Sequence, residues 1–159
     1  MTSTYDTIVV GAGPGGSAAA LRLAQHGWRV LLLDRQAFPR DKTCGDGLSP
    51  EALRILNRLG LADLAPQRGF RFDGISVTSP NGASFEAALD PNGQPGYVVP
   101  RIALDDGLRT AAIAAGAEFI GQVRVTGIHE QDGTVAVVGP RSSYAWRGQS
   151  VILAVGANM

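Results

Sequence analysis

The fold is decided by residues 7–20, Thr-Ile-Val-Val-Gly-Ala-Gly-Pro-Gly-Gly-Ser-Ala-Ala-Ala. The apolar residues 8–10 predict a short buried strand, and residues 17–25, after the glycines, predict a helix. Residues 29–33 predict a second buried strand, which ends at Asp34. This order of strand, glycine-rich turn, helix, strand and acid is that of a dinucleotide-binding βαβ unit.

Each glycine of the G-x-G-x-x-G turn has its own task. Gly11 allows the tight turn, Gly13 lets the backbone approach a pyrophosphate, and Gly16 lets the helix pack closely on the strand. The amino terminus of the helix offers N–H groups and the positive end of the helix dipole. Asp34 is placed to accept hydrogen bonds from ribose hydroxyls. Two alternatives stay open: a turn that needs glycine only for packing, and an Asp34 that pairs with Arg35 or caps a turn.

The composition is that of a globular α/β protein. The chain has 159 residues, of which 45% are hydrophobic and 18% charged, and its formal net charge is zero. This length predicts one domain, and the neutral charge gives no support for a nucleic-acid partner. The single cysteine, Cys44, excludes an internal disulfide and predicts a reducing compartment.

Nothing in the sequence predicts a secretory leader or a membrane span. The first residues lack a basic region, and no apolar run approaches the roughly 20 residues that cross a bilayer. We therefore expect a cytoplasmic protein, and peripheral membrane contact stays open.

The rest of the chain predicts further helices and strands. The first is a helix from the Ser49 cap to Gly60, and a hairpin over 72–87 follows, with its turn at Pro80-Asn81-Gly82. A second helix is predicted over 104–115. A β-meander over 123–129, 134–138 and 144–147, with a turn at Asp132-Gly133, precedes an apolar strand over 151–155 that leads into Gly156. A meander that crosses over and returns through an apolar strand ending in Ala-x-Gly is typical of flavoproteins that bind two dinucleotides. A nicotinamide dehydrogenase would continue with βα units instead.

Three further stretches make a family resemblance visible. They are Phe38-Pro-Arg-Asp-Lys-Thr-Cys-Gly-Asp-Gly-Leu48, Arg101-Ile-Ala-Leu-Asp-Asp-Gly-Leu108 and Val151-Ile-Leu-Ala-Val-Gly-Ala157. Together with the glycine turn and Asp34, they resemble the amino-terminal part of the FAD-dependent geranylgeranyl reductase-like oxidoreductases, within the para-hydroxybenzoate hydroxylase-like flavoproteins. The segment with Cys44 is the most specific match, because it separates the reductase-like members from most aromatic hydroxylases.

The resemblance implies an α/β, Rossmann-like FAD-binding domain with a βαβ start, a hairpin excursion over about residues 70–100 on the substrate side, and a three-stranded meander. It implies FAD as the cofactor. The implied contacts are Gly11, Gly13, Pro14, Gly15 and Gly16 at the pyrophosphate, Asp34 with its neighbour Arg35 at the adenosine, Cys44, Gly45, Asp46 and Gly47 beside the flavin, Arg101 at the ribityl–phosphate region, the backbone of Val125 at the adenine, and Ala154 and Gly156 at the end of the closing strand.

Several of these assignments have a purely structural alternative. Cys44, the candidate catalytic residue, is equally interpreted as a small buried residue without chemistry. Arg101 is alternatively a surface residue at a helix start, and Lys42 and Asp46 favour solvent-facing or turn-forming roles. His26 and His129 have no partner at a metal-binding spacing, so we expect no metal site.

The function implied for the parent protein is the reduction of isoprenoid C=C bonds, with a hydrophobic isoprenoid as substrate and a reduced nicotinamide or ferredoxin as electron donor. The alternatives are an FAD-dependent monooxygenase or halogenase, a non-catalytic nucleotide-binding module, and an NAD(P) dehydrogenase. Members of the family are longer and carry a later Gly-Asp motif. Because the chain stops at Asn158-Met159, we expect an amino-terminal piece that is inactive alone and that self-associates through its uncovered face.

Overall fold

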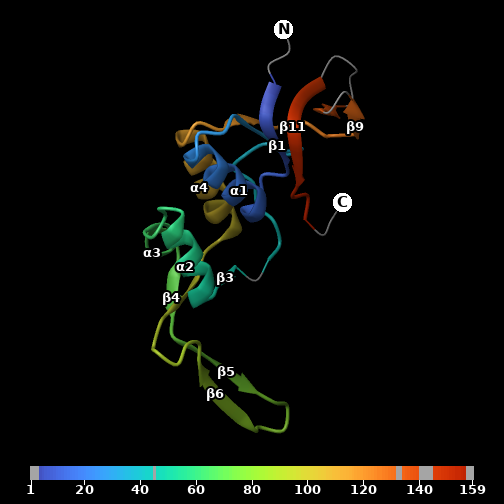
Figure 1. The fold of residues 1–159 in the computed structure, drawn as a ribbon. Coiled ribbons are helices and arrows are strands. Elements are labelled where there is room, and N and C mark those ends of the chain that lie inside the picture. The colour runs from blue at the N-terminus through green and yellow to red at the C-terminus, as the bar shows by residue number, and fades with distance from the viewer. Residues whose placement is uncertain (1–3, 45, 132–133, 140–144, 157–159) are drawn as a thin grey trace. The chain divides into compact units, whose positions relative to one another are not determined.

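The computed structural model describes residues 4–44, 46–131, 134–139 and 145–156. The chain divides into two compact units, one of residues 1–40 with 105–159 and one of residues 41–104 (Figure 1). The long helix α4, Arg101–Ala114, contributes residues to both units. Among the described residues, none of the helices has the length and apolar character needed to cross a bilayer.

The first unit is built on a six-stranded sheet with the order β8-β2-β1-β11-β10-β9. Strands β8, β2, β1 and β11 are parallel, and β10 and β9 continue the sheet in antiparallel pairs. The strands are β1 (Thr4–Val10), β2 (Val30–Leu33), β8 (Glu118–Ile120), β9 (Gly127–Gln131), β10 (Thr134–Val138) and β11 (Ala145–Leu153). This is the Rossmann-like α/β architecture expected from the sequence, with the βαβ start and the meander both present.

Both faces of the parallel strands are covered, which explains why their sequences are continuously apolar. Helix α1, Pro14–Gln25, packs against β1 and β2 and buries Ala20 and Leu21 (Figure 1). A cluster of Tyr5, Ile8, Val10, Leu31, Leu33 and Val137 fills the core, with Ile120, Val125, Trp146 and Val151 packed against it. The burial of each large aliphatic side chain stabilises the fold by about 1.5–3 kcal/mol.

The third meander strand and the closing apolar strand are one continuous strand, and their prediction as two strands is wrong. The first residues of β11 pair antiparallel with β10, and the strand pairs parallel with β1 from Arg147 to Leu153. The polar residues between the two stretches find partners inside the sheet. Ser150 Oγ lies 2.7 Å from Thr7 Oγ1 and donates to the Asp6 carbonyl at 3.0 Å. At Gly148 an added Cβ would lie 3.1 Å from Ile8 Cγ1, so the small residue fits a tight position.

Other predicted boundaries also shift. The first meander strand begins at Gly127 rather than at residue 123, because Val123 N–H instead donates to the Asp34 carbonyl at 2.9 Å. Strand β8 completes the parallel edge of the sheet and was not predicted. Helices α1 and α4 begin about one turn earlier than expected, at Pro14 and Arg101. The turn expected at residues 132–133 lies outside the described residues.

The second unit contains a three-stranded antiparallel sheet, order β3-β7-β4, and a separate hairpin, β5-β6. Its elements are β3 (Gly47–Leu48), α2 (Pro50–Arg58), α3 (Leu64–Arg68), β4 (Phe70–Phe72), β5 (Gly74–Thr78), β6 (Ser84–Ala88) and β7 (Gly96–Val98). The expected Ser49 cap is confirmed, because Ser49 Oγ accepts from Ala52 N–H at 3.3 Å. The expected hairpin is also confirmed, whereas α3, β3 and β4 were not predicted.

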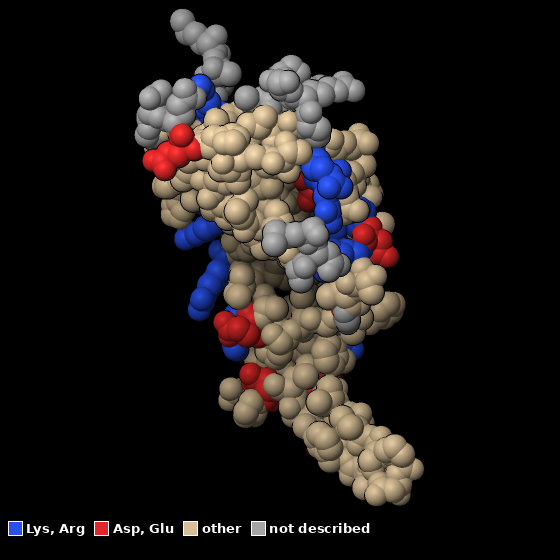
Figure 2. All heavy atoms as spheres, turned by 90° about the vertical axis from the view of Figure 1, so that its right-hand side faces the viewer, with Lys and Arg blue, Asp and Glu red and all other residues tan. Residues whose placement is uncertain are grey.

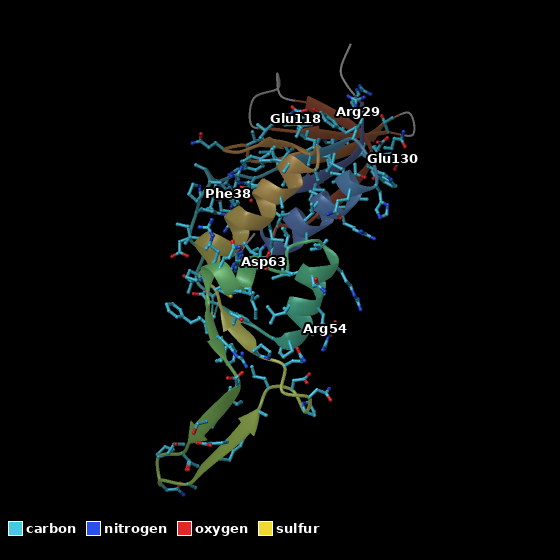
Figure 3. The ribbon with its side chains drawn as sticks, turned by 90° about the vertical axis from the view of Figure 1, so that its left-hand side faces the viewer. Arg29, Phe38, Arg54, Asp63, Glu118 and Glu130 are labelled. Atoms are coloured by element: carbon cyan, nitrogen blue, oxygen red, sulfur yellow. The ribbon has the colours of Figure 1, made fainter. Side chains whose placement is uncertain are left out.

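A tyrosine links the central strand β1 to the edge strand β8. Tyr5 Oη donates to Glu118 Oε2 at 2.7 Å, and the Arg29 guanidinium lies 5.8 Å from the centre of the Tyr5 ring. Arg29 and Glu118 are seen at the same end of the sheet in Figure 3. Burial, followed by the hydrogen bond to Glu118, raises the pKa of Tyr5 from 10.0 to about 12.

We expect Tyr5→Phe to lower the free energy of unfolding by about 0.5–1.5 kcal/mol near neutral pH, because the hydrogen bond is lost. The raised pKa makes this difference depend on pH. Above pH 10.0 the tyrosine ionises in the unfolded chain but stays neutral in the folded one until about pH 12, so the contribution of Tyr5 falls across this window. Urea unfolding of both proteins at pH 8 and pH 11 measures it. A difference that stays constant or grows with pH would contradict the assignment.

Candidate functional site

The glycine turn leaves the amino terminus of α1 open. Gly13 is the N-cap and supplies no side chain to the helix, and Pro14 occupies its first position. The first backbone bond of the helix runs from Ser17 N–H to the Gly13 carbonyl at 2.9 Å. The N–H groups of Gly15 and Gly16 therefore lie ahead of the intrahelical ladder, where a helix has no acceptors of its own. Together with the positive end of the helix dipole, they form an anion-binding position.

Two of the glycines are required by the packing of the fold itself. A Cβ at Gly11 would lie 2.3 Å from the Ala154 carbonyl oxygen, and a Cβ at Gly16 would lie 1.8 Å from the Gly11 carbonyl oxygen. Gly11 also has a φ of +106°, which favours glycine. Ala154 is held against the turn because its N–H donates to the Val10 carbonyl at 2.8 Å. The predicted closing strand thus ends directly against the glycine turn, and Gly156 follows with a φ of +75°.

The other two glycines face open space. A Cβ at Gly15 would meet nothing within 4 Å, and a Cβ at Gly13 would meet only Arg40 Nη2, at 3.6 Å. No contact within the described protein therefore explains a glycine at Gly13, whose φ of −71° suits any residue. The space beside Gly13 and Gly15 and the open helix terminus fit the pyrophosphate of FAD. The interpretation of the turn as packing alone is wrong for these two positions.

Asp34 is buried at the end of β2 and braces the turn. Its Oδ2 accepts from Ala12 N–H at 2.7 Å, and its Oδ1 accepts from Gln36 N–H at 2.8 Å. The second bond caps the turn that follows β2, and the contact of Asp34 to a ribose stays a prediction. The carboxylate therefore helps to hold the glycine turn in place, whatever further contact it makes to a ribose. Its neighbour Arg35 is exposed.

The segment after β8 lies beside the carboxyl end of β2. Val123 N–H donates to the Asp34 carbonyl, and Gln122 N–H donates to the Gln36 carbonyl at 3.2 Å. Val125 belongs to this segment and not to a strand, and its half-buried side chain packs on the core cluster. The backbone contact of Val125 to adenine stays a prediction.

The remaining predicted residues belong to the second unit. Cys44 is exposed, so its interpretation as a buried residue is wrong. Asp46 has a φ of +54°, and its carbonyl accepts from Val99 N–H at 2.9 Å. Gly47 begins β3 and pairs with Val98, and Arg101 is the first residue of α4 and half-buried. Gly45 lies outside the described residues.

Two charged residues of the site were missed by sequence reasoning. Arg40 follows Asp34 on the loop after β2, and Asp105 is a fully buried residue of α4. Arg40 Nη1 lies 3.0 Å from Asp105 Oδ2. Both residues fall in the stretches that carry the family resemblance. The family motifs contained both residues, but a single Arg and a single Asp far apart in the chain do not predict an ion pair.

The family profile described as "FAD binding domain" matches residues 4–143. The chain belongs to this FAD-binding domain family. FAD is accordingly its cofactor, as the sequence predicted.

Two relatives of this FAD-binding chain are named reductases. It is 40% identical to menaquinone reductase of Mycolicibacterium smegmatis over 87% of this chain and 34% of that protein. It is 37% identical to digeranylgeranylglycerophospholipid reductase of Methanosarcina acetivorans over 83% of this chain and 32% of that protein. The chain thus spans about a third of the length of these relatives. The expected geranylgeranyl reductase-like family is confirmed.

Two solved structures show the same fold as this chain. A geranylgeranyl bacteriochlorophyll reductase-like protein from Thermoplasma acidophilum is 26% identical, with a TM-score of 0.79 over 97% of this chain and 40% of that chain. The myxobacterial chondrochloren halogenase, an FAD-dependent halogenase variant, is 27% identical, with a TM-score of 0.82 over 99% of this chain and 38% of that chain. The fold is therefore common to reductases and halogenases.

The two classes of glycine predict opposite outcomes for alanine substitution. We expect Gly16→Ala to destabilise the fold by about 1–3 kcal/mol or more, because its Cβ has no space. We expect Gly13→Ala to retain the fold but to weaken FAD binding about tenfold, since its Cβ enters the ligand space. Thermal unfolding and flavin-fluorescence titration measure both. A Gly13→Ala variant that binds FAD like the wild type would show that the space is not used by the cofactor.

Proposed function

We propose that this chain is the FAD-binding part of a flavin-dependent reductase that saturates isoprenoid C=C bonds. The observation that carries the proposal is the segment Lys42-Thr-Cys-Gly-Asp-Gly-Leu48, which resembles the reductase-like members of the family. The names of the two reductase relatives support the same substrate class, because a digeranylgeranyl lipid is an isoprenoid.

In this proposal the residues of the first unit bind the ADP half of the cofactor. Gly13, Gly15 and Gly16 contact the pyrophosphate, and Asp34 accepts from the adenosine ribose while it braces the turn. The segment of residues 121–125, next to the end of β2, contacts the adenine through the backbone at Val125. Pro14 adds the pre-set φ of a first helical residue and removes an N–H that would need a partner.

Arg101 and the segment that starts at Cys44 are assigned to the flavin half of the cofactor. Arg101 is a fork donor, which suits phosphate and ribityl oxygens better than lysine does. The positive φ of Asp46 turns the backbone between Cys44 and β3, and the bond from Val99 N–H holds that turn. The exposed Cys44 thiol is available to a substrate alkene, and we assign it the task of positioning that alkene.

The chemistry that bound reduced FAD would supply is a hydride for one alkene carbon; the second carbon would take a proton, so that the C=C bond would become a C–C bond with two added hydrogens. One reduced nicotinamide, or two one-electron transfers from reduced ferredoxin, would return the two electrons. The protein must exclude water from the reacting carbons and hold the alkene in place.

The exposed apolar face of the β5-β6 hairpin favours a hydrophobic ligand. Ile75 and Val77 pair across the hairpin with Ala87 and Phe85, so these four side chains share one face. Ile75 and Val77 are each 48% exposed, and Phe85 is 57% exposed. The side of the hairpin visible in Figure 2 shows no charged residue. An exposed apolar face of this kind fits an isoprenoid chain, a membrane surface or a second copy of the protein.

The proposal is tested on the flavin-loaded protein in the longest form that its gene encodes. Anaerobic incubation with reduced nicotinamide and menaquinone, or with a geranylgeranyl lipid, is followed by mass spectrometry of the lipid. We expect the gain of two hydrogens per reduced double bond together with oxidation of the donor. Oxygen-dependent hydroxylation or halogenation of an aromatic compound, with no lipid reduction, would overturn the proposal in favour of the monooxygenase or halogenase alternative. A flavin that no donor reduces would favour a non-catalytic module.

Cys44→Ala tests the assigned role of the thiol. We expect at least about a tenfold loss in the rate of lipid reduction, with FAD affinity and flavin reduction by the donor unchanged, because the thiol acts on the substrate only. Thr43→Ala changes the exposed neighbouring side chain and is the matched control. Equal rates for both variants would leave Cys44 without this role.

A further inference from the structure

The loop that follows β2 places a buried cation in the first unit. The Arg40 side chain is only 9% exposed. Its Nε and Nη1 atoms are buried and meet no hydrogen-bond acceptor in good geometry among the described residues. Buried donors are normally satisfied, and an unsatisfied one costs free energy. Asp105 Oδ2 lies at ion-pair distance from Nη1, so the described residues give the guanidinium a charge partner but leave its Nε donor without an acceptor.

The surroundings of Arg40 fix where it lies. Its Nη1 is 3.0 Å from Asp105 Oδ2, and its Nη2 is 4.0 Å from Asp34 Oδ2. The same Nη2 is the one group within 4 Å of a Cβ added at Gly13. The guanidinium carbon lies 4.9 Å from the centre of the Phe38 ring, so the ring supports one face of the group. Arg40 is thus held at the glycine turn and is not free to swing into solvent.

The charges around the turn also call for a cation. The pyrophosphate of FAD is a dianion, and it must bind at a turn that is braced by the buried Asp34 carboxylate. The end of a helix contributes only about half a positive charge. Arg40 Nη2 lies 4.0 Å from Asp34 Oδ2 and 3.6 Å from a Cβ added at Gly13, so its positive charge, which Asp105 also shares, lowers the repulsion between the Asp34 carboxylate and the phosphates. Its planar fork suits phosphate oxygens.

We propose that Arg40 binds the pyrophosphate of FAD, and that Asp105 is a positioning residue that holds the Arg40 guanidinium at the glycine turn. This adds a side-chain cation to a site otherwise made of backbone N–H groups. The inference rests on FAD as the cofactor and is independent of the isoprenoid substrate proposed above.

The test compares ADP with adenosine, which differ only in the diphosphate. Both are titrated against the purified chain by calorimetry, and FAD is titrated by flavin fluorescence. We expect Arg40→Ala to weaken ADP and FAD binding about tenfold to a hundredfold and to change adenosine affinity by less than about twofold. We expect Arg40→Lys, which keeps the charge and loses the fork, to fall between the wild type and Arg40→Ala.

Arg109→Ala is the matched control. The guanidinium carbon of Arg109 also lies near the Phe38 ring, 5.4 Å from its centre, but Arg109 Nη2 pairs with Asp106 Oδ1 at 2.7 Å. Phe38 is seen beside α4, the helix of Arg109, in Figure 3. We expect this variant to bind ADP and adenosine with an unchanged ratio of affinities. Circular dichroism and thermal unfolding establish that each variant is folded.

The positioning role of Asp105 predicts that Asp105→Asn lowers the preference for ADP without abolishing it, because the guanidinium stays present but is no longer anchored by a charge. Arg40 variants that weaken ADP and adenosine by the same factor would overturn the proposal, since Arg40 would then act only through the shape of the loop. A wild-type chain without preference for ADP, including one that binds neither compound, would also overturn it.

Discussion

The close approach of three backbone segments at the glycine turn is the constraint on which the rest of the site depends. Gly11 lies against the Ala154 carbonyl, and Gly16 lies against the Gly11 carbonyl, so neither position has room for a single methyl group. This contact ties α1 to the ends of β1 and β11 at a fixed position. The amino terminus of α1 is therefore aimed at one place, and the N–H groups of its first turn are available there without further adjustment.

The buried charges around the turn stabilise this arrangement, although removing them from water costs free energy of desolvation. Asp34 uses both carboxylate oxygens to hold backbone N–H groups of the turn and of the loop after β2. A buried carboxylate beside an anion-binding position is unfavourable unless a cation compensates it. Arg40 lies between Asp34 and Asp105 and supplies one positive charge for two buried carboxylates. The site thus combines two carboxylates with one guanidinium, and the helix dipole adds partial positive charge at the turn.

The two units divide the properties of the protein between them. The glycine turn, Asp34 and Arg40 belong to the first unit and are concerned with a cofactor that many enzymes of this fold share. The segment at Cys44 and the apolar hairpin belong to the second unit. Since one fold hosts many chemistries, the proposed function assigns the choice between a reductase and a halogenase to residues of the second unit. This is why the proposed function rests on the segment at residues 42–48 and not on the glycine turn.

The sequence by itself determined the βαβ start, the tight turn at Gly11, the close packing at Gly16, the Ser49 cap and the β5-β6 hairpin, because these depend on residues close together in the chain. Local periodicity, capping and turn chemistry act over a few residues, so they can be read from the sequence. Only the tertiary structure decided that β11 is one continuous strand, since its polar middle is stabilised by Thr7 and the Asp6 carbonyl from β1. It alone brought Arg40 to Asp105 and to Gly13. Strand pairing and buried ion pairs join residues that are distant in the chain, and their stability comes from burial and partners that no local pattern contains.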